Sequence, residues 1–153
     1  MIIKLLSEHL QNITAHAEKT YPEECCGIVL GYAGDEGKTV VEVIPTDNAW
    51  STQAADFSQD STDYSERGRY AIAPEVMLKA QKEARDRALN IIGIYHYHPD
   101  HSATPSEFDR QYAWQEYSYI IVSVDNGKSA EVKSWCLDNN HQFQEEKVKN
   151  CKA

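Results

Sequence analysis

The sequence contains no long apolar run and no surplus of basic residues. No stretch approaches the roughly twenty apolar residues that a membrane-spanning helix needs, and residues 1–10 lack the pattern of a signal peptide. The 15 lysines and arginines are outnumbered by 24 aspartates and glutamates, so the formal net charge is −9. A surface of that sign repels the phosphates of nucleic acid. We therefore expect a cytoplasmic protein that binds neither nucleic acid nor membrane.

Cysteine is scarce, and its spacing does not indicate a disulfide framework. The four cysteines include one adjacent pair, Cys25 and Cys26, and no C-x-x-C pair. Adjacent cysteines are poor disulfide partners for each other, and the cytoplasm keeps thiols reduced. The sequence also lacks internal repeats and low-complexity tracts. We expect four reduced thiols in an ordinary globular chain.

The length and composition are those of one globular domain. The chain has 153 residues, of which 41% are hydrophobic and 25% are charged. A chain of this length buries about two-thirds of its unfolded surface and needs no staples to fold. We predict a single domain over residues 1–148, a frayed tail over residues 149–153, and a monomer or weak homo-oligomer.

Helical and strand periodicities follow one another along the chain. Residues 90–97 form the most apolar predicted strand, as is typical of a central strand covered on both faces. Residues 47–69 are polar and aperiodic, and we expect a long surface loop there. Predicted helices cover residues 3–19, 74–89 and 104–114, and predicted strands cover residues 26–32, 39–44, 90–97, 117–124, 131–137 and 142–147. This order indicates helices wrapped around a β-sheet.

Two histidines stand at the end of the most apolar strand, in the run His96-Tyr97-His98-Pro99. Residues two apart on a strand point to the same face, and their Cα atoms lie about 7 Å apart. Both imidazoles can therefore reach one metal ion. Pro99 has no backbone N–H group to donate to a neighbouring strand, so we expect it to end the strand. The histidines would then lie at the end of the strand, in a site that is open to solvent.

A third ligand is expected from the helix that follows. Six residues separate Pro99 from Ser106, and Ser106 and Asp109 share one helical face. We expect Thr104 to cap this helix together with Glu107. Asp109 would add a carboxylate to two imidazoles, a donor set that suits zinc and leaves a fourth position for water. Ser106 could offer its hydroxyl to an oxyanion. We predict a zinc site that hydrolyses an amide bond.

The other histidines lack such neighbours. His101 lies in the loop after the strand, and we expect that it is not a ligand. His9, His16 and His141 have no ligand-type residues at fitting positions, so we expect them at the surface.

A zinc hydrolase also needs a base that takes a proton from water. Glu23 and Glu24 stand just before a buried strand and could enter the site. Both could instead cap a helix end in water. The residues alone do not decide between these alternatives, or between the two glutamates.

Together these motifs resemble the JAMM (MPN+) metalloprotease family. The family pattern is an upstream glutamate, then H-x-H-P, about six residues, and S-x-x-D. It stands here as His96-Tyr97-His98-Pro99, six residues, and Ser106-Glu107-Phe108-Asp109. The upstream motif of bacterial members, P-x-E-x-C-G, is matched by Pro22-Glu23-Glu24-Cys25-Cys26-Gly27.

The resemblance implies a fold and a set of roles. The fold would be α/β and cytidine-deaminase-like, with a curved mixed β-sheet flanked by helices. His96, His98 and Asp109 would bind one Zn²⁺ ion, with water as the fourth ligand. Glu24 would be the general base, and Ser106 would help to hold the tetrahedral intermediate.

The resemblance also implies a substrate class. Family members cleave peptide or isopeptide bonds after the C-terminal glycine of ubiquitin or ubiquitin-like proteins. This compact chain looks most like short, stand-alone bacterial members that act on ubiquitin-like sulfur-carrier proteins. Some of these remove an amino acid such as cysteine from the carrier's Gly-Gly tail, a step of cysteine biosynthesis. An extended tail could lie along a sheet edge, with the 47–69 loop in contact with the carrier.

Three other functions fit parts of the sequence. A non-catalytic MPN scaffold has the same fold but usually lacks the zinc ligands, all of which are present here. A zinc nucleoside deaminase needs a P-C-x-x-C ligand pair, which this chain lacks. An H-x-H phosphoesterase on a TIM barrel typically takes about 250 residues. We keep the scaffold, a module for interaction only, as the alternative.

Overall fold

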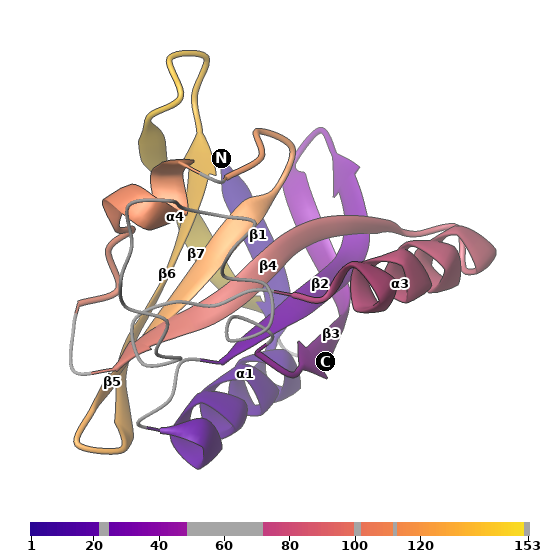
Figure 1. The fold of residues 1–153 in the computed structure, drawn as a ribbon. Helices are drawn as coiled ribbons and strands as arrows, with labels where there is room; N and C mark the ends of the chain where they lie inside the picture. The colour runs from indigo at the N-terminus through magenta and orange to yellow at the C-terminus, as the bar shows by residue number, and fades with distance from the viewer. Residues whose placement is uncertain (22–24, 49–71, 100–101, 112, 152–153) are drawn as a thin grey trace.

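The structure is a computed structural model, and it describes residues 1–21, 25–48, 72–99, 102–111 and 113–151. Within these residues, strands and helices follow one another as Figure 1 shows. The strands are β1 (Ile2–Leu6), β2 (Cys26–Gly34), β3 (Gly37–Thr46), β4 (Asn90–Pro99), β5 (Ser118–Asp125), β6 (Lys128–Leu137) and β7 (Phe143–Cys151). The helices are α1 (Ser7–Thr20), α3 (Pro74–Asp86) and α4 (Glu107–Gln111). None of the described helices is long and apolar enough to cross a membrane.

The described strands form one mixed sheet in the order β1-β3-β2-β4-β5-β6-β7. The strand β4 pairs in parallel with β5 and in antiparallel orientation with β2. At the other side, β1 pairs in parallel with both β3 and β7, which closes the sheet into a barrel. The predicted mixed sheet with flanking helices is therefore present, and the sheet curves so far that its two edge strands pair with each other.

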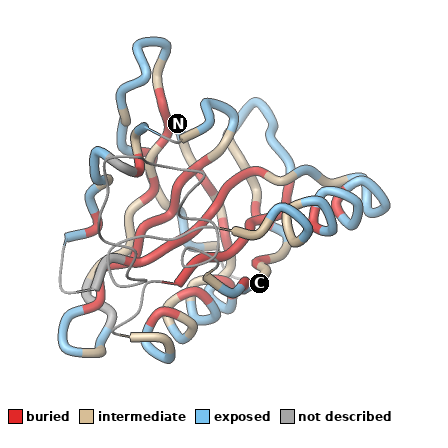
Figure 2. Tube along the Cα trace, viewed as in Figure 1, coloured by how far each residue is buried: buried red, intermediate tan, exposed pale blue. Residues whose placement is uncertain are grey.

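The two longer helices cover opposite faces of this sheet. On β2, Val29 joins the buried cluster that includes Ile13 of α1, whereas Ile28 and Leu30 join the cluster that includes Ala84 of α3. Successive residues of a strand point to opposite faces, so α1 and α3 lie on different sides. The strands between them are buried along most of their length (Figure 2), as predicted for β4.

The chain begins with a strand and not with the predicted helix over residues 3–19. Ile3 and Leu5 alternate with less buried residues in β1, and α1 begins only at Ser7. A short apolar run fits the start of an amphipathic helix as well as a strand, so local pattern does not separate the two. The pairing of β1 with β3 and β7 decides it, and both partners lie far along the chain.

Residues 149–151, which we expected to fray, complete β7. Lys149 pairs with Lys4, and Cys151 pairs with Leu6 of β1. A chain terminus frays unless other backbone ties it down, and here the parallel pairing with β1 does so. The same pairing closes the barrel.

The remaining elements differ from the predictions mainly at their ends. The helix α3 begins at the predicted Pro74 but ends at Asp86, before residue 89. Asn126 and Gly127, at the predicted turn between β5 and β6, both have positive φ, which asparagine and glycine tolerate in hairpin turns. All four cysteines lie in the described part and are thiols, as predicted.

Two histidines that we expected at the surface are packed between elements. His9 is 5% exposed, and its Nδ1 accepts a hydrogen bond from the Leu6 amide at 3.1 Å. Its Nε2 donates to the Val41 carbonyl at 3.1 Å, so the ring caps α1 and ties it to β3. His16 is half-buried, and its Nδ1 lies 2.7 Å from the Tyr95 hydroxyl of β4. The predicted surface positions were therefore wrong, because the partners of both rings are distant in the sequence.

Candidate metal centre

His96 lies near the end of β4, where the strand is held on both sides. It pairs with Cys26 of β2 and with Ile121 of β5, and its side chain is fully buried. Its neighbours Tyr95 and Tyr97 belong to the cluster packed against α1. Because side chains alternate along a strand, His96 faces the opposite side of the sheet.

The strand continues beyond His96 to the proline that we expected to end it. His98 pairs with Ser123 of β5, and Pro99, the last residue of β4, pairs with Val124. The side chain of His98 lies outside the described part of the structure. The prediction that it is a metal ligand therefore remains a prediction.

Asp109 comes from α4 and meets His96 from a different part of the chain. Its Oδ2 atom lies 3.3 Å from Nε2 of His96, and the exposed fraction of its side chain is 4%. The structure thus brings together two of the residues that the sequence predicted to share a metal ion.

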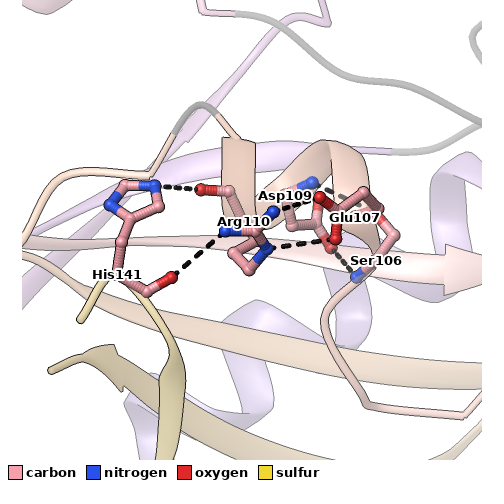
Figure 3. Close-up of polar contacts among 5 residues, drawn as sticks. All are labelled: Ser106, Glu107, Asp109, Arg110 and His141. Atoms are coloured by element: carbon pink, nitrogen blue, oxygen red, sulfur yellow. Dashed lines mark hydrogen bonds and ion pairs between the residues drawn. The ribbon is translucent and has the colours of Figure 1, made fainter.

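Ser106, and not the predicted Thr104, caps the helix that carries Asp109. The Ser106 amide donates to Oδ2 of Asp109 at 2.8 Å, and the Asp109 amide donates to Oγ of Ser106 at 3.1 Å (Figure 3). This is a reciprocal capping box, and α4 accordingly begins at Glu107. Thr104 with Glu107 forms the same pattern two residues earlier, so sequence alone allowed either register.

The cap leaves the hydroxyl proton of Ser106 available. A hydroxyl has one O–H donor and two acceptor lone pairs, and the Asp109 amide uses one lone pair. The Ser106 side chain lies on an exposed residue beside the buried carboxylate. Its O–H group can therefore donate to a substrate, as the prediction for Ser106 requires.

His141, the third histidine that we expected at the surface, does lie there and contacts the end of α4. His141 is exposed, but its Nε2 donates to the Arg110 carbonyl at 2.7 Å. The Arg110 guanidinium donates back to the His141 carbonyl at 3.3 Å, and it also pairs with Glu107 (Figure 3). The hydrogen bond from Arg110 lowers the pKa of the Glu107 carboxyl. These contacts fix α4 against the turn between β6 and β7.

Two side chains of β6 that no sequence motif marks contact the segment before α4. Glu131 and Trp135 bond to the backbone of Ala103. Neither residue forms a motif with the predicted ligands, which lie more than twenty positions away in the chain. Only the strand order brings them to the site.

The predicted bases, Glu23 and Glu24, lie outside the described residues, as does His101. The described chain resumes at Cys25, and Cys26 is the β2 residue that pairs with His96. Both cysteines are buried. Cys25, which follows Glu24 in the sequence, is therefore adjacent to the β2 residue that pairs with His96.

The described residues can be tested against the geometry of zinc. Within the described part of the chain, no group of three or more His, Cys, Asp or Glu side chains could hold a metal ion. The pair that is described has suitable donors, a nitrogen of His96 and an oxygen of Asp109. In a tetrahedral zinc site with bonds of about 2.0–2.1 Å, two ligand atoms lie about 3.3 Å apart. The observed separation is 3.3 Å, so these two residues fit.

Residues 6–138 match the family described as prokaryotic homologs of the JAB domain. The chain belongs to this family. The matched range contains the upstream glutamates, His96, His98, Ser106 and Asp109. The predicted JAMM/MPN membership and its fold are therefore confirmed.

Two curated relatives cover most of this JAB-family chain. It is 27% identical over 133 residues to a desampylase of Haloferax volcanii. This alignment covers 84% of this chain and 85% of the relative. It is 28% identical over 116 residues to a probable TtuB-protein conjugate cleaving protease of Thermus thermophilus. This alignment covers 76% of this chain and 66% of the relative.

Solved structures show the same JAB fold. A protein from Desulfitobacterium hafniense, solved in solution, has a TM-score of 0.78 at 25% identity and covers 99% of this chain and 94% of that one. A JAB1/MPN domain protein from Archaeoglobus fulgidus has a TM-score of 0.54 at 18% identity, over 98% of this chain and 100% of that one. The second likeness concerns the fold alone.

Proposed function

We propose that the protein is a zinc-dependent metallopeptidase that cleaves the peptide or isopeptide bond after the C-terminal glycine of a ubiquitin-like protein. The observation that carries this proposal is the buried pair of His96 and Asp109, 3.3 Å apart. The two residues belong to the H-x-H-P and S-x-x-D motifs of a JAB-family chain. His98 is proposed as the third ligand.

The residues would divide the reaction between them. Zinc bound here would supply Lewis-acid chemistry and bring the pKa of a water molecule toward about 7. Glu24 would take the proton from that water and later give it to the leaving amine. Ser106 would donate its hydroxyl hydrogen to the oxyanion that develops on the scissile carbonyl. The Ser106 amide, which donates to Asp109 at 2.8 Å, would keep the carboxylate turned toward His96.

The substrate is proposed from the names of the relatives and from the motifs that the chain shares with the family. One relative is a desampylase, and the other is named for cleaving conjugates of TtuB with proteins. We propose that this chain acts on a ubiquitin-like sulfur carrier and releases an amino acid such as cysteine from its Gly-Gly tail.

An extended tail needs backbone to lie against. The described pairing of β2 with β4 begins at Cys26, the first residue of β2, which lies opposite His96. The strand β4 continues beyond His96 to Pro99. This end of β4 is our proposed track for the tail, because strand addition would lead the scissile bond to His96 and Asp109.

The alternative function is a JAB scaffold that binds partners without chemistry. The observation against it is the desolvated His96–Asp109 pair, because an interaction module has no use for a buried carboxylate turned toward an imidazole. Burying such groups is costly unless they are paired or bind a metal.

The proposal is tested by incubating the purified protein with a carrier that bears cysteine on its Gly-Gly tail. Mass spectrometry should show a mass loss that corresponds to hydrolysis at the terminal glycine. Treatment with a zinc chelator should abolish the reaction, and added zinc should restore it. An intact conjugate in the presence of the zinc-loaded protein would favour the scaffold or another leaving group. Conjugates that carry a lysine-linked protein separate those two outcomes.

A further inference from the structure

The helix that carries Asp109 cannot hold its own position. The helix α4 spans five residues, whereas isolated helices shorter than about 12–15 residues are marginal in water. Asp109 must nevertheless stay opposite His96, since a metal site tolerates little displacement of its ligands. Other parts of the molecule must therefore fix this segment.

The first anchor is a pair of side chains from β6. The Ala103 amide donates to Oε1 of Glu131 at 3.0 Å, and the Ala103 carbonyl accepts from Nε1 of Trp135 at 3.0 Å. Ala103 is fully buried, so these side chains satisfy both backbone groups of one buried loop residue. A buried backbone N–H or C=O group without a hydrogen-bond partner would lower the free energy of unfolding by its full desolvation cost.

The anchor residues belong to the same framework as His96. Glu131 pairs with Ser123 of β5, and Trp135 pairs with Tyr119. The strand β5 in turn pairs with β4, where Ile121 lies opposite His96. The loop before α4 is thus bonded to the sheet that carries the first ligand.

The second anchor is His141 in the turn between β6 and β7. A carbonyl only accepts hydrogen bonds, so Nε2 of His141 carries the proton that it donates to the Arg110 carbonyl at 2.7 Å (Figure 3). The turn is itself held by Asp138, whose Oδ1 accepts from the amides of Asn140 at 2.8 Å and Gln142 at 3.0 Å. His141 has a φ of 59°. The end of α4 is thereby tied to a turn that is held by its own hydrogen bonds.

We propose that Glu131, Trp135 and His141 are positioning residues that hold Asp109 opposite His96 and so set the affinity for zinc. The proposal rests on the proposed function. Side chains that orient metal ligands from outside typically change metal affinity by about 10–100-fold when they are removed. Here they act through the backbone of α4 and of the loop before it.

The test measures the zinc affinity of the full chain by competition with a chromogenic chelator, together with the melting temperature of the metal-free protein. Trp135→Phe removes the indole donor and keeps an aromatic ring. His141→Ala removes the imidazole at an exposed position, and Glu131→Ala removes the acceptor. We expect each variant to weaken zinc binding about 10–100-fold, and saturating zinc should restore most of the lost hydrolysis.

Conservative variants and a matched control separate positioning from general stability. Glu131→Gln keeps an Oε1 acceptor and His141→Gln keeps an N–H donor, so both should bind zinc nearly as the wild type does. Ile13→Val removes one buried methyl group from the cluster between α1 and the sheet, on the face opposite to His96. It should lower the melting temperature without changing zinc affinity.

The outcomes are distinguishable. If Trp135→Phe, His141→Ala and Glu131→Ala bind zinc as tightly as the wild type and only melt earlier, the positioning role is wrong while the proposed function stands. If the wild type itself binds no zinc, the proposed function fails and this proposal with it.

Discussion

One carboxylate oxygen of Asp109 meets two partners from different elements. Its Oδ2 lies 3.3 Å from Nε2 of His96 in β4 and accepts the Ser106 amide at 2.8 Å. The helix cap and the proposed metal site therefore share an atom. A change at Asp109 can be designed to keep the contact with the Ser106 amide and lose the charged metal ligand.

Asp109→Asn is such a change. The asparagine side chain keeps an oxygen that can accept from the Ser106 amide, but it carries no negative charge. We expect a folded protein whose zinc affinity falls by orders of magnitude, because a neutral amide oxygen is a poor zinc ligand. Chelator competition measures the affinity. Glu145→Gln, an exposed acid on β7, is the control and should bind zinc normally; equal affinities in both variants would remove Asp109 from the ligand set.

Glu24→Gln tests the proposed base. It should keep one equivalent of zinc and lower kcat by about 10²–10⁴-fold, because only proton transfer is lost. Glu23→Gln is the matched control at the neighbouring position and should remain active. If Glu23→Gln lost activity while Glu24→Gln kept it, the alignment of the upstream motif would be off by one residue.

Ser106→Ala tests two roles of one side chain. Loss of the capping hydroxyl should lower the free energy of unfolding by about 1 kcal/mol. Loss of an oxyanion donor should lower kcat by about 10²–10³-fold. Ser106→Thr keeps the hydroxyl and should retain most of the free energy of unfolding and most of kcat. Denaturant unfolding and single-turnover kinetics measure the two effects separately; a stability loss with an unchanged rate would leave Ser106 only its capping role.

The residues show what could be predicted from sequence. His96 and Asp109 were found because each lies in a short motif whose spacing follows from strand and helix geometry. The cap was assigned two residues early, since Thr104 with Glu107 and Ser106 with Asp109 form the same local pattern. Local pattern cannot rank them, and the contact of Asp109 with His96 does.

Contacts between distant segments were not predictable. His9, Trp135 and His141 act on partners that are about thirty positions away, and nothing near them in the sequence marks those partners. The strand β1 and the end of β7 were missed for the same reason. The end of β7 pairs with β1, and β1 pairs with both β7 and β3.

Gly27→Ala should destabilise the protein although it adds a single methyl group. A Cβ atom at Gly27 would overlap the ring of Tyr95, which is buried and bonded through its hydroxyl to His16. Overpacking of this kind typically costs about 1–3 kcal/mol. Gly34→Ala on the same strand is the control, since the nearest atom to a Cβ there lies 3.9 Å away. Equal unfolding free energies in urea for the two variants would contradict the packing at Gly27.

The stability of the metal-free protein should depend on pH through His16. Burial lowers the pKa of His16 below 6.5, and the charge of Lys19 lowers it further. The unfolded chain therefore binds the proton more readily than the folded one. The stabilisation is fully present above the unfolded pKa of about 6.5 and is lost as the pH falls toward the folded pKa.

His16→Gln removes this titration. The difference in unfolding free energy between wild type and His16→Gln should shrink as the pH is lowered from 7 to 5, because both proteins share every other titrating group. Urea unfolding at several pH values measures that difference. A difference that stays constant across this range would mean that His16 titrates alike in both states.

We propose that one zinc ion held by His96, His98 and Asp109 makes this chain a hydrolase of ubiquitin-like conjugates. The most direct test of this proposal is a titration of metal-free protein with zinc while hydrolysis of a Gly-Gly-linked conjugate is followed. The rate should rise linearly and level off at one equivalent of zinc per chain. Full hydrolysis by metal-free protein, or no hydrolysis at one equivalent of zinc, would exclude this zinc-dependent reaction.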